Sequence, residues 1–434
     1  MDIPLLRFFR RADILAVLAH RSFRYLFLAR TVSSAGDAIY SVALPWLVLE
    51  ELNSPMSLGF TLSASVVPYI FMGPPAGVLA DRIDRKFLMI LSHAVQVAVL
   101  AALIAAGRLV ELHTLHFAVA AFLITAAGQF FYPARAAILP NLVPREDLVA
   151  GNAALTAGSR SIDIGGKAAA GFLILTIGAL NTFGIILVAN GLAALLLGRI
   201  TAPAQAKLQS TIGREVHLHT RIVGVARDAW TDFVASLAYI LRHPLLRALA
   251  LVGLVFNAFH LPAASILVPV FFRETLKAGP DSFGLFNSIE SAAMFVALPM
   301  IPWLARRLGD GKVSLISLIA LGVLIGGLAA VGQLWQAFAI AALMGLLTAG
   351  VLPMQSLVQA VSPDHMRGKV VANLAAANIL LVIFTGPLIA WLTESITVRP
   401  LFLATGIVVL LSGFALMTVK EVREGRVSTT RQDG

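Results

Sequence analysis

Long apolar runs limit what this chain can fold into more than any other feature of its sequence. A helix that crosses the hydrocarbon core of a bilayer needs about 20 predominantly apolar residues, and such runs recur along the whole chain. Hydrophobic residues make up 58% of the chain and charged residues 13%, whereas soluble proteins have roughly 45–50% and 25%. We therefore expect a membrane protein with most of its residues in lipid. The twelve runs span residues 23–49, 57–79, 87–106, 114–138, 150–176, 180–199, 245–271, 282–304, 313–331, 334–358, 371–393 and 399–419.

The fifth run is the least regular, because Arg160, Asp163 and Lys167 interrupt it. If it crosses the membrane, the chain is an all-α membrane protein with twelve transmembrane helices and both termini on the same side. If it does not, eleven helices cross and the termini lie on opposite sides.

The basic residues favour the twelve-helix arrangement. Lys and Arg accumulate on the cytoplasmic side of a bilayer. In this arrangement 26 of the 33 Lys and Arg residues lie on one side, in the connecting segments or the end turns of the runs, and four lie on the other. The remaining three, Arg30, Arg160 and Lys167, lie deeper within the runs. We expect both termini in the cytoplasm and the protein in the bacterial inner membrane. The net charge of +10 then reflects topology, and no nucleic-acid partner is expected.

The sequence lacks the residues that several other kinds of protein need. It has no Cys, which excludes disulfides, thiolate metal sites and thiol nucleophiles. It has no Gly-rich phosphate loop of an ATP-driven pump, and neither the His-Glu-x-x-His nor the Gly-x-Ser-x-Gly motif of hydrolases. We expect no enzyme activity, no cofactor and no metal. No signal peptide is evident in residues 1–24.

The longest polar stretch, residues 201–244, divides the chain into two halves, 1–200 and 245–419, with a cytoplasmic tail at 420–434. Arg residues alternate with apolar residues along this stretch, and its segment 228–241 is either an amphipathic helix on the membrane surface or part of a solvated linker. Similar polar landmarks follow the second and eighth runs. A parallel repeat of two six-helix halves is typical of transporters whose substrate site lies between the halves.

A ten-residue segment after the second run is the most specific motif. Residues 77–86 read Gly-Val-Leu-Ala-Asp-Arg-Ile-Asp-Arg-Lys. They resemble the loop motif Gly-x-Leu-Ala-Asp-Arg-x-x-Arg-Lys/Arg of the major facilitator superfamily at every defined position. The resemblance implies the fold of that superfamily and alternating access. It also implies a gating role for Gly77, Asp81, Arg82, Arg85 and Lys86. The alternative, a basic anchor at the membrane surface, explains the Arg and Lys but not Gly77 and Asp81.

Further short patterns are similar to the branch that contains enterobactin and macrolide exporters, which are drug:proton antiporters. This resemblance implies proton-coupled efflux of an amphipathic drug or siderophore. One departure weakens the inference of export: the Gly-Pro pair that these exporters often carry in the fifth span is replaced by Gly165-Gly166-Lys167, although Gly386-Pro387 occurs in the eleventh run. The matching patterns are Arg30-x-x-Ser33-x-x-Gly36-Asp37, Leu44-Pro45, Gly73-Pro74 and Asn152-Ala-Ala-Leu155.

Ionisable side chains within the runs are the candidate residues for proton coupling and for the central cavity. Each costs on the order of a few kcal/mol in lipid, so such groups usually face a cavity or a proton pathway. Asp37 follows Arg30 by two helical turns, which places the two on nearly the same face. Asp37 then exchanges protons, forms a permanent ion pair or binds a cationic group of the substrate. Arg30 can instead extend to the membrane surface. The six residues are Arg30, Asp37, Arg160, Asp163, Lys167 and Glu290.

In the fifth run, spacings of three and four residues place Arg160, Asp163 and Lys167 on one helical stripe. This stripe should face the central cavity or the first span. Its surplus of about one positive charge favours an anionic or zwitterionic substrate, or a balancing interaction with Asp37. Alternatively, Arg160 is solvated at the cytoplasmic end.

Polar and aromatic residues elsewhere in the runs are candidates for a substrate pocket. His260 either titrates near neutral pH or makes a fixed hydrogen bond, and aromatic residues in a helix bundle also serve packing. The candidates are Gln129, Tyr132, Asn257, His260, Gln355 and Gln359.

Together these features predict a secondary active transporter that moves a small amphipathic organic molecule by alternating access, with proton-coupled export as the expected activity. Its expected partners are this substrate, protons and membrane lipids, and we expect a monomer. Two alternatives remain open. One is uptake, or flipping of a lipid or lysophospholipid, without proton antiport. The other is a non-transporting membrane receptor on the same fold.

Overall fold

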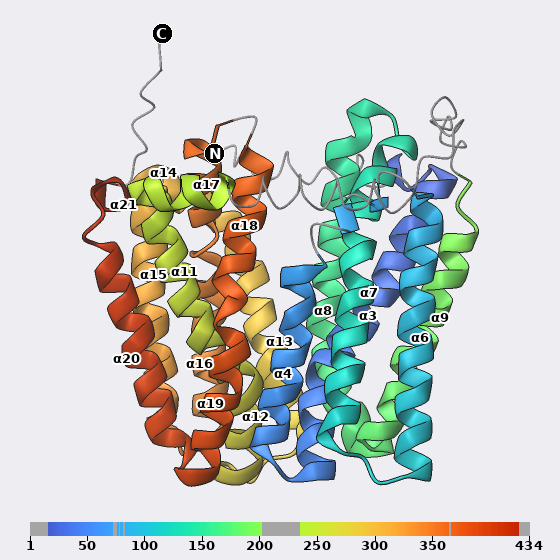
Figure 1. The fold of residues 1–434 in the computed structure, drawn as a ribbon, viewed down its shortest axis with the longest axis horizontal. Helices are drawn as coiled ribbons and strands as arrows, with labels where there is room; N and C mark the ends of the chain where they lie inside the picture. Colours follow the sequence, from blue (N-terminus) through green and yellow to red (C-terminus); the bar gives the residue numbers. More distant parts are fainter. Residues whose placement is uncertain are drawn as a thin grey trace. The chain divides into compact units, whose positions relative to one another are not determined.

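The structure, a computed structural model, describes residues 16–72, 76–77, 79–80, 83–201, 235–363 and 366–424. The secondary structure within these ranges is helical, with no strand among the described residues (Figure 1). Helices that cross lipid must satisfy their own backbone hydrogen bonds, so a chain of apolar runs has little alternative.

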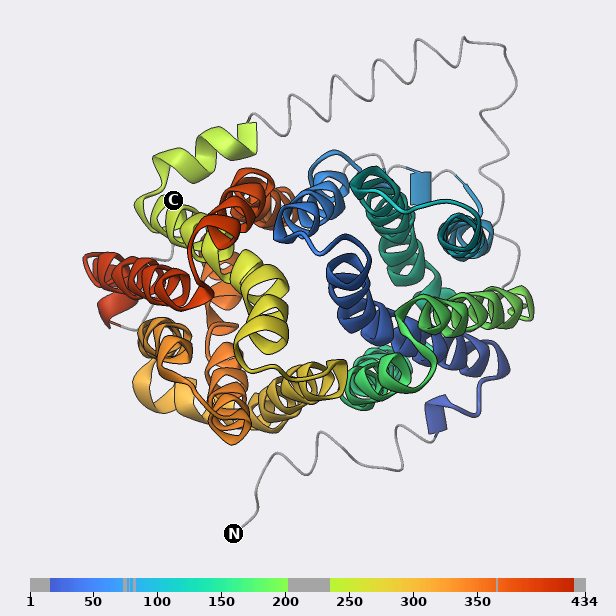
Figure 2. The ribbon, with the colours of Figure 1, turned by 90° about the horizontal axis from the view of Figure 1, so that it is seen from below.

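The chain divides into two compact units. Unit 1 comprises Met1–Leu52 and Ala64–Arg227, and unit 2 comprises Asn53–Ser63 and Asp228–Gly434. Figure 2 views the helices nearly end-on and shows a bundle in each unit, coloured mainly blue to green in unit 1 and mainly yellow-green to red in unit 2. The boundaries expected from the sequence at 200, 244 and 419 stay predictions. Residues 228–234 of the expected amphipathic segment 228–241 lie outside the described residues, and residues 235–241 are helical.

Unit 1 is built from five long helices and part of a sixth. In its centre α3 packs against α8 and α9, while α6 packs against α7 and α9. Asp84 begins α6, because its side chain accepts a hydrogen bond from the Phe87 amide at 2.7 Å. Gly178, with φ of +83°, ends α8 and begins α9. The helices are α3 (Arg21–Leu52), the second part of α4 (Pro55–Phe71), α6 (Arg85–Leu109), α7 (Thr114–Ile138), α8 (Leu148–Ile177) and α9 (Ala179–Gly198).

Unit 2 contains the remaining helices and the first residues of α4. Those residues are held there by Glu394, whose Oε1 accepts hydrogen bonds from Ser54 Oγ at 3.0 Å and the Met56 amide at 3.2 Å. After α11 the seventh run continues through two π-helical turns, Ala263–Leu267 and Phe271–Thr275, on either side of α12. The helices are α11 (Pro244–Pro262), α12 (Val268–Val270), α13 (Pro280–Ala297), α14 (Ile301–Leu308), α15 (Asp310–Gly327), α16 (Leu334–Ala349), α17 (Pro353–Val361), α18 (Arg367–Leu380), α19 (Val382–Ser395), α20 (Val398–Leu416) and α21 (Lys420–Glu424).

Among the described residues, ten helical segments are long and apolar enough to cross a membrane. Two further helices do not qualify: α4 has 17 residues, and α8 contains Arg160, Asp163 and Lys167. The chain is therefore a multi-pass membrane protein, and the number of twelve crossings stays a prediction. The ten segments are Arg21–Leu52, Arg85–Leu109, Thr114–Asn141, Ala179–Gly198, Pro244–Thr275, Pro280–Leu308, Asp310–Ala330, Leu334–Val361, Arg367–Ser395 and Val398–Leu416.

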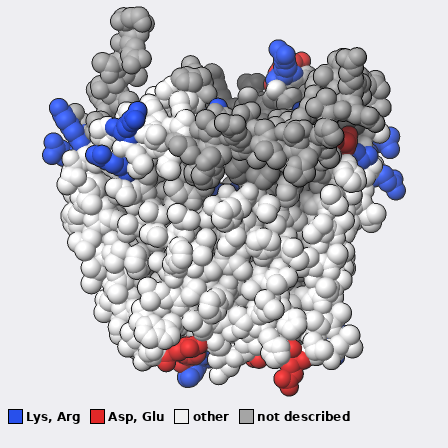
Figure 3. Space-filling model, viewed as in Figure 1, with Lys and Arg blue, Asp and Glu red and all other residues white. Residues whose placement is uncertain are grey.

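The charged side chains that are visible on the surface lie near the ends of the helices. On the face shown in Figure 3, most of the visible Lys and Arg lie near the upper end, Asp and Glu are visible at both ends, and an uncharged band lies between the two ends. In unit 2 the guanidinium of Arg307 lies 4.3 Å from the ring centre of Trp303, at the end of α14. Trp and basic residues commonly mark the edge of the hydrocarbon core. That the basic end faces the cytoplasm remains a prediction.

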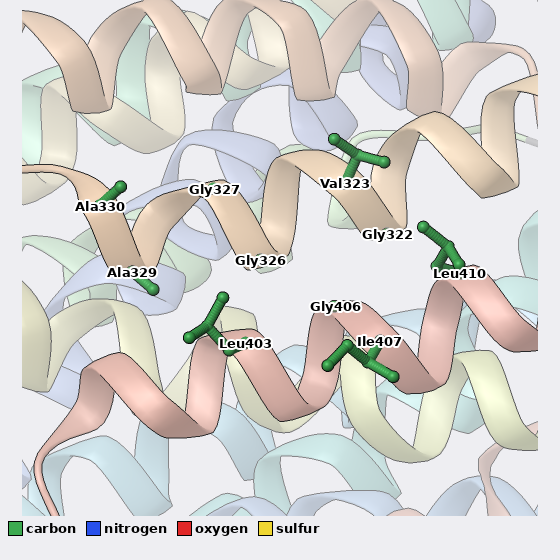
Figure 4. Close-up of a pocket in the computed structure, with 10 residues that line it drawn as sticks. All are labelled: Gly322, Val323, Gly326, Gly327, Ala329, Ala330, Leu403, Gly406, Ile407 and Leu410. Atoms are coloured by element: carbon green, nitrogen blue, oxygen red, sulfur yellow. The ribbon is translucent and has the colours of Figure 1, made fainter.

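Glycines allow α15 and α20 to pack backbone against backbone. A Cβ atom added at Gly406 would lie 2.5 Å from the Gly326 amide nitrogen and 2.6 Å from the Gly322 carbonyl oxygen. Beside this crossing runs a groove of about 450 Å³, shown in Figure 4, whose lining residues are all apolar. It has no polar side chain that would orient a ligand, so we interpret it as a consequence of helix packing in lipid.

We predict that Gly406→Ala destabilises the protein by about 1–3 kcal/mol, because the new methyl group meets backbone atoms that cannot rotate away. Gly327→Ala is the matched control on the partner helix, since its Cβ would find only Ile340 Cδ1 at 3.9 Å. The measurement is the thermal unfolding midpoint of the purified protein in detergent. A Gly406→Ala protein that melts at or above the temperature of the parent would refute the proposed close packing.

Candidate functional site

A cavity of about 330 Å³ lies within unit 1, and its lining is strongly charged. It is formed by α3, α7 and α8, which are otherwise apolar helices. Charged groups at this depth are expected only where water or a ligand reaches them, so this cavity is the candidate functional site. The lining residues are Arg30, Ser34, Asp37, Tyr132, Arg135, Leu155, Thr156, Ser159, Arg160 and Asp163.

An ion pair on α3 is the central feature of this cavity. Arg30 Nη1 donates to Asp37 Oδ2 at 2.9 Å and to Ser33 Oγ at 3.3 Å. The two charged side chains meet across two helical turns, as the spacing of seven residues predicts. Only 13% of the Arg30 side chain is exposed, compared with 53% for Asp37. Asp37 is therefore the more accessible member of the pair.

Two glycines bring α8 close enough to α3 to form the cavity. A Cβ at Gly158 would lie 2.8 Å from the Phe27 ring, and a Cβ at Gly166 would lie 2.7 Å from Ala38 Cβ. Gly166 belongs to the Gly165-Gly166-Lys167 sequence that stands in place of a Gly-Pro pair. Its role here is to fix the contact with α3 directly beside Asp37.

The charged stripe of α8 separates into a pair and a single cation. Lys167 Nζ and Asp163 Oδ2 are 3.0 Å apart, and both side chains are mostly buried. Arg160 and Asp163 line the cavity, whereas Lys167 is not among its lining residues. In the part of the chain that the structure describes, no carboxylate forms a salt bridge with Arg160. The unbalanced positive charge of this stripe is therefore that of Arg160.

Arg135 is a cavity residue that the sequence did not single out. Its guanidinium carbon lies 5.7 Å from the ring centre of Tyr132, and that of Arg30 lies 5.8 Å from the same ring. Arg135 is in the last turn of α7, where a basic residue normally indicates only the cytoplasmic end of a span. The sequence feature that could have indicated Arg135 is its spacing of three residues from Tyr132, a predicted pocket residue, because this spacing puts both on one helix face.

The other residues expected to line a pocket are spread over both units. Gln129, on α7, is not among the lining residues of the cavity. In unit 2, Asn257 donates to the Gly253 carbonyl of its own helix at 2.8 Å, and the His260 ring stacks on Phe256 at 4.7 Å. Glu290 lies on α13, and Gln355 and Gln359 are exposed on α17. A role for these residues in substrate binding stays a prediction.

The basic residues of the loop motif bind the ends of neighbouring helices. Arg85 Nη1 donates to the Ala137 carbonyl at 2.7 Å, and Lys86 Nζ donates to the carbonyls of Gly198 at 2.7 Å and Ile200 at 2.8 Å. These carbonyls lie at the C-terminal ends of α7 and α9, where positive charge is favourable. A Cβ at Gly77 would have no atom of the described residues within 4 Å. Asp81 and Arg82 lie outside the described residues.

Comparison with known families gives one match over nearly the whole chain. Residues 12–431 match the major facilitator family described as transmembrane secretion effector. Among individual relatives, the chain is 26% identical over 410 residues to the multidrug efflux pump Tap of Mycolicibacterium fortuitum, covering 92% of this chain and 95% of that one. It is 26% identical to the uncharacterized MFS-type transporter YfiS of Bacillus subtilis, covering 92% and 94% of the two chains.

Solved structures of transporters have the same fold. The nucleoside transporter NupG is similar with a TM-score of 0.73 at 14% identity, covering 92% of this chain and 98% of that one. A bacterial homologue of the iron transporter ferroportin, in an inward-facing state, has a TM-score of 0.70 at 16% identity over 92% and 98% of the two chains.

We predict that Asp163 and Lys167 stabilise each other as a pair. Asp163→Asn or Lys167→Met alone should each lower the free energy of unfolding by about 1–3 kcal/mol, because each removes one charge of a mostly buried ion pair. The double substitution should cost less than the sum of the two single ones. Thermal unfolding in detergent measures all four proteins. Additive effects would show that the pair does not interact.

Proposed function

The chain belongs to the transmembrane secretion effector family of the major facilitator superfamily, and from this premise we propose that it exports small amphipathic organic molecules in exchange for protons. A transporter of this type has no need of a catalytic site. The name multidrug efflux pump, carried by relatives that match 92% of the chain at 26–27% identity, supports export of drugs. The proposed location is the cytoplasmic membrane of a bacterium.

The observation that carries the proposal is the Arg30 to Asp37 ion pair at the charged cavity. An antiporter needs a group that binds a proton in one stage of the cycle and releases it in another. Asp37 is a carboxylate with an exposed side chain next to a mostly buried cation. Protonation would remove its charge, release Arg30 from the ion pair and change the electrostatics of the whole cavity.

Exchange requires that a proton and the substrate weaken each other's binding, and this effect is reciprocal. When the cavity is open to the outside, a proton that binds Asp37 displaces the substrate. When it is open to the cytoplasm, loss of the proton restores the carboxylate and substrate binds again. The glycine contacts beside Asp37 link this change to the packing of α3 against α8. Such a change at a helix contact is what a rocking movement requires.

In a host without its own efflux pumps, the parent chain should raise the minimum inhibitory concentrations of several amphipathic antibiotics, and Asp37→Asn should abolish the increase. Asp281→Asn, an exposed carboxylate in unit 2, is the matched control and should retain resistance. The amount of each protein in the membrane is measured by immunoblot. Equal resistance from the parent and Asp37→Asn would exclude Asp37 as the coupling group.

Proton exchange is tested in proteoliposomes with a pH-sensitive dye in the lumen and one of the exported antibiotics outside. The parent should move protons against the drug, whereas Asp37→Asn should move no protons when the drug is added. A fluorescent lysophospholipid in the same assay tests lipid flipping. Movement of that lipid without protons would favour the alternative of lipid transport, and no movement of any compound would favour a receptor.

A further inference from the structure

The cavity of unit 1 holds more positive than negative charge. Arg30 is paired with Asp37, and Lys167 is paired with Asp163. Arg135 and Arg160 also line the cavity, and neither has a salt bridge within the described ranges. Three guanidinium groups and two carboxylates therefore line the cavity, and Lys167, outside the lining, pairs with one of these carboxylates. The two guanidinium groups without a salt bridge, Arg135 and Arg160, lie on different helices.

The surroundings of these two guanidinium groups suit an oxyanion. Guanidinium groups bind carboxylates and phosphates through paired N–H donors. Ser159, one residue before Arg160, has its Oγ shielded from solvent without a hydrogen-bond partner in the described structure. Thr156 lines the same wall one helical turn earlier. A ligand with several acceptor oxygens would satisfy the hydroxyl group and offset the repulsion between the cations.

The part of the cavity lining that belongs to α3 offers an acceptor. Arg30 binds the Oδ2 atom of Asp37, and no hydrogen bond to Oδ1 is found among the described residues. Because 53% of this side chain is exposed, Oδ1 is available to an amine. The cavity thus combines a donor-rich wall on α7 and α8 with an acceptor on α3.

The direction of coupling decides between a purely anionic and a zwitterionic substrate. Protonation of Asp37 makes the cavity more positive, so a purely anionic substrate would bind more tightly with the proton than without it. Exchange of substrate for protons requires instead that the bound proton weakens substrate binding. A substrate that also places an amine on Asp37 competes with the proton directly.

We infer that the substrates are amphipathic zwitterions, with a carboxylate or phosphate at Arg135, Arg160 and Ser159 and an amine at Asp37. The Tyr132 ring and Leu155 lie in the same lining and contact the apolar part. This inference rests on the proposed export function and names its substrate class. Arg135 and Arg160 are specificity residues in it, whereas proton exchange depends on Asp37.

Three fluorescent probes with the same apolar group test the charge requirement. Nα-dansyl-lysine carries a carboxylate and an amine, its methyl ester carries only the amine, and its ε-N-acetyl derivative carries only the carboxylate. Binding to the full-length protein in lipid nanodiscs is followed by dansyl fluorescence. The zwitterion should bind about tenfold or more tightly than either derivative, since each derivative lacks one charged hydrogen-bonding group.

Single substitutions test binding of the carboxylate and binding of the amine separately. Arg135→Gln and Arg160→Gln should each weaken binding of the zwitterion and of the acetyl derivative about tenfold and leave binding of the methyl ester unchanged. Asp37→Asn should weaken binding of the zwitterion and of the methyl ester but not binding of the acetyl derivative. Arg108→Gln is the matched control. Arg108 lies in the last turn of α6, outside the cavity lining, and its guanidinium donates to Asn181 Oδ1, so this variant should bind all three probes like the parent.

Two results would overturn the inference. The first is equal affinity of the parent protein for the zwitterion and its methyl ester. The second is an equal loss of affinity for all three probes in Arg135→Gln or Arg160→Gln, with unchanged thermal stability of the variant. If proton-coupled drug export continues despite either result, only the substrate class is rejected. If export is absent as well, the proposed function fails with it.

Discussion

The cost of placing charge in apolar surroundings is the constraint on which the structure of unit 1 depends. Helices α3, α7 and α8 are long and mostly apolar, yet each contributes charged side chains to one cavity. Two ion pairs reduce the cost at Asp37 and Asp163. Gly158 and Gly166 allow α8 to approach α3 closely enough for this grouping. The charges are thus gathered where water or a ligand can reach them, and the rest of each helix can face lipid.

The same physics explains which features were predictable from the sequence. The fourth run, 114–138, has the bounds of α7, because hydrophobic length and flanking polar residues determine where a span ends. The spacing of Arg30 and Asp37 predicts their contact, since both lie on one regular helix. The three charges of the fifth run mark it as irregular in the sequence. The structure agrees, because α8, which forms this run, is a long helix that is not apolar enough to count among the ten spanning segments.

Other features depend on contacts that no local pattern records. Arg135 has the sequence context of an ordinary surface anchor, and only the neighbouring helices show that it lines the cavity. The two π-helical turns, Ala263–Leu267 and Phe271–Thr275, each widen the helix locally, and the hydrophobic pattern of the seventh run does not indicate where an α-helical turn is replaced in this way. The loop motif predicts gating, and the structure adds a local role, in which Arg85 and Lys86 cap the ends of α7 and α9.

The backbone contact between α15 and α20 also has a genetic consequence. Every single-base change that converts a glycine codon to another amino acid adds at least a Cβ atom. At Gly322 and Gly406 such an atom would meet backbone within 2.6 Å, so no one-step change there avoids a collision. The cavity lining is different, because residues such as Thr156 and Ser159 already carry a Cβ atom. Substitutions that alter the chemistry of the cavity are therefore expected in α7 and α8, while the glycines of the α15–α20 contact stay fixed.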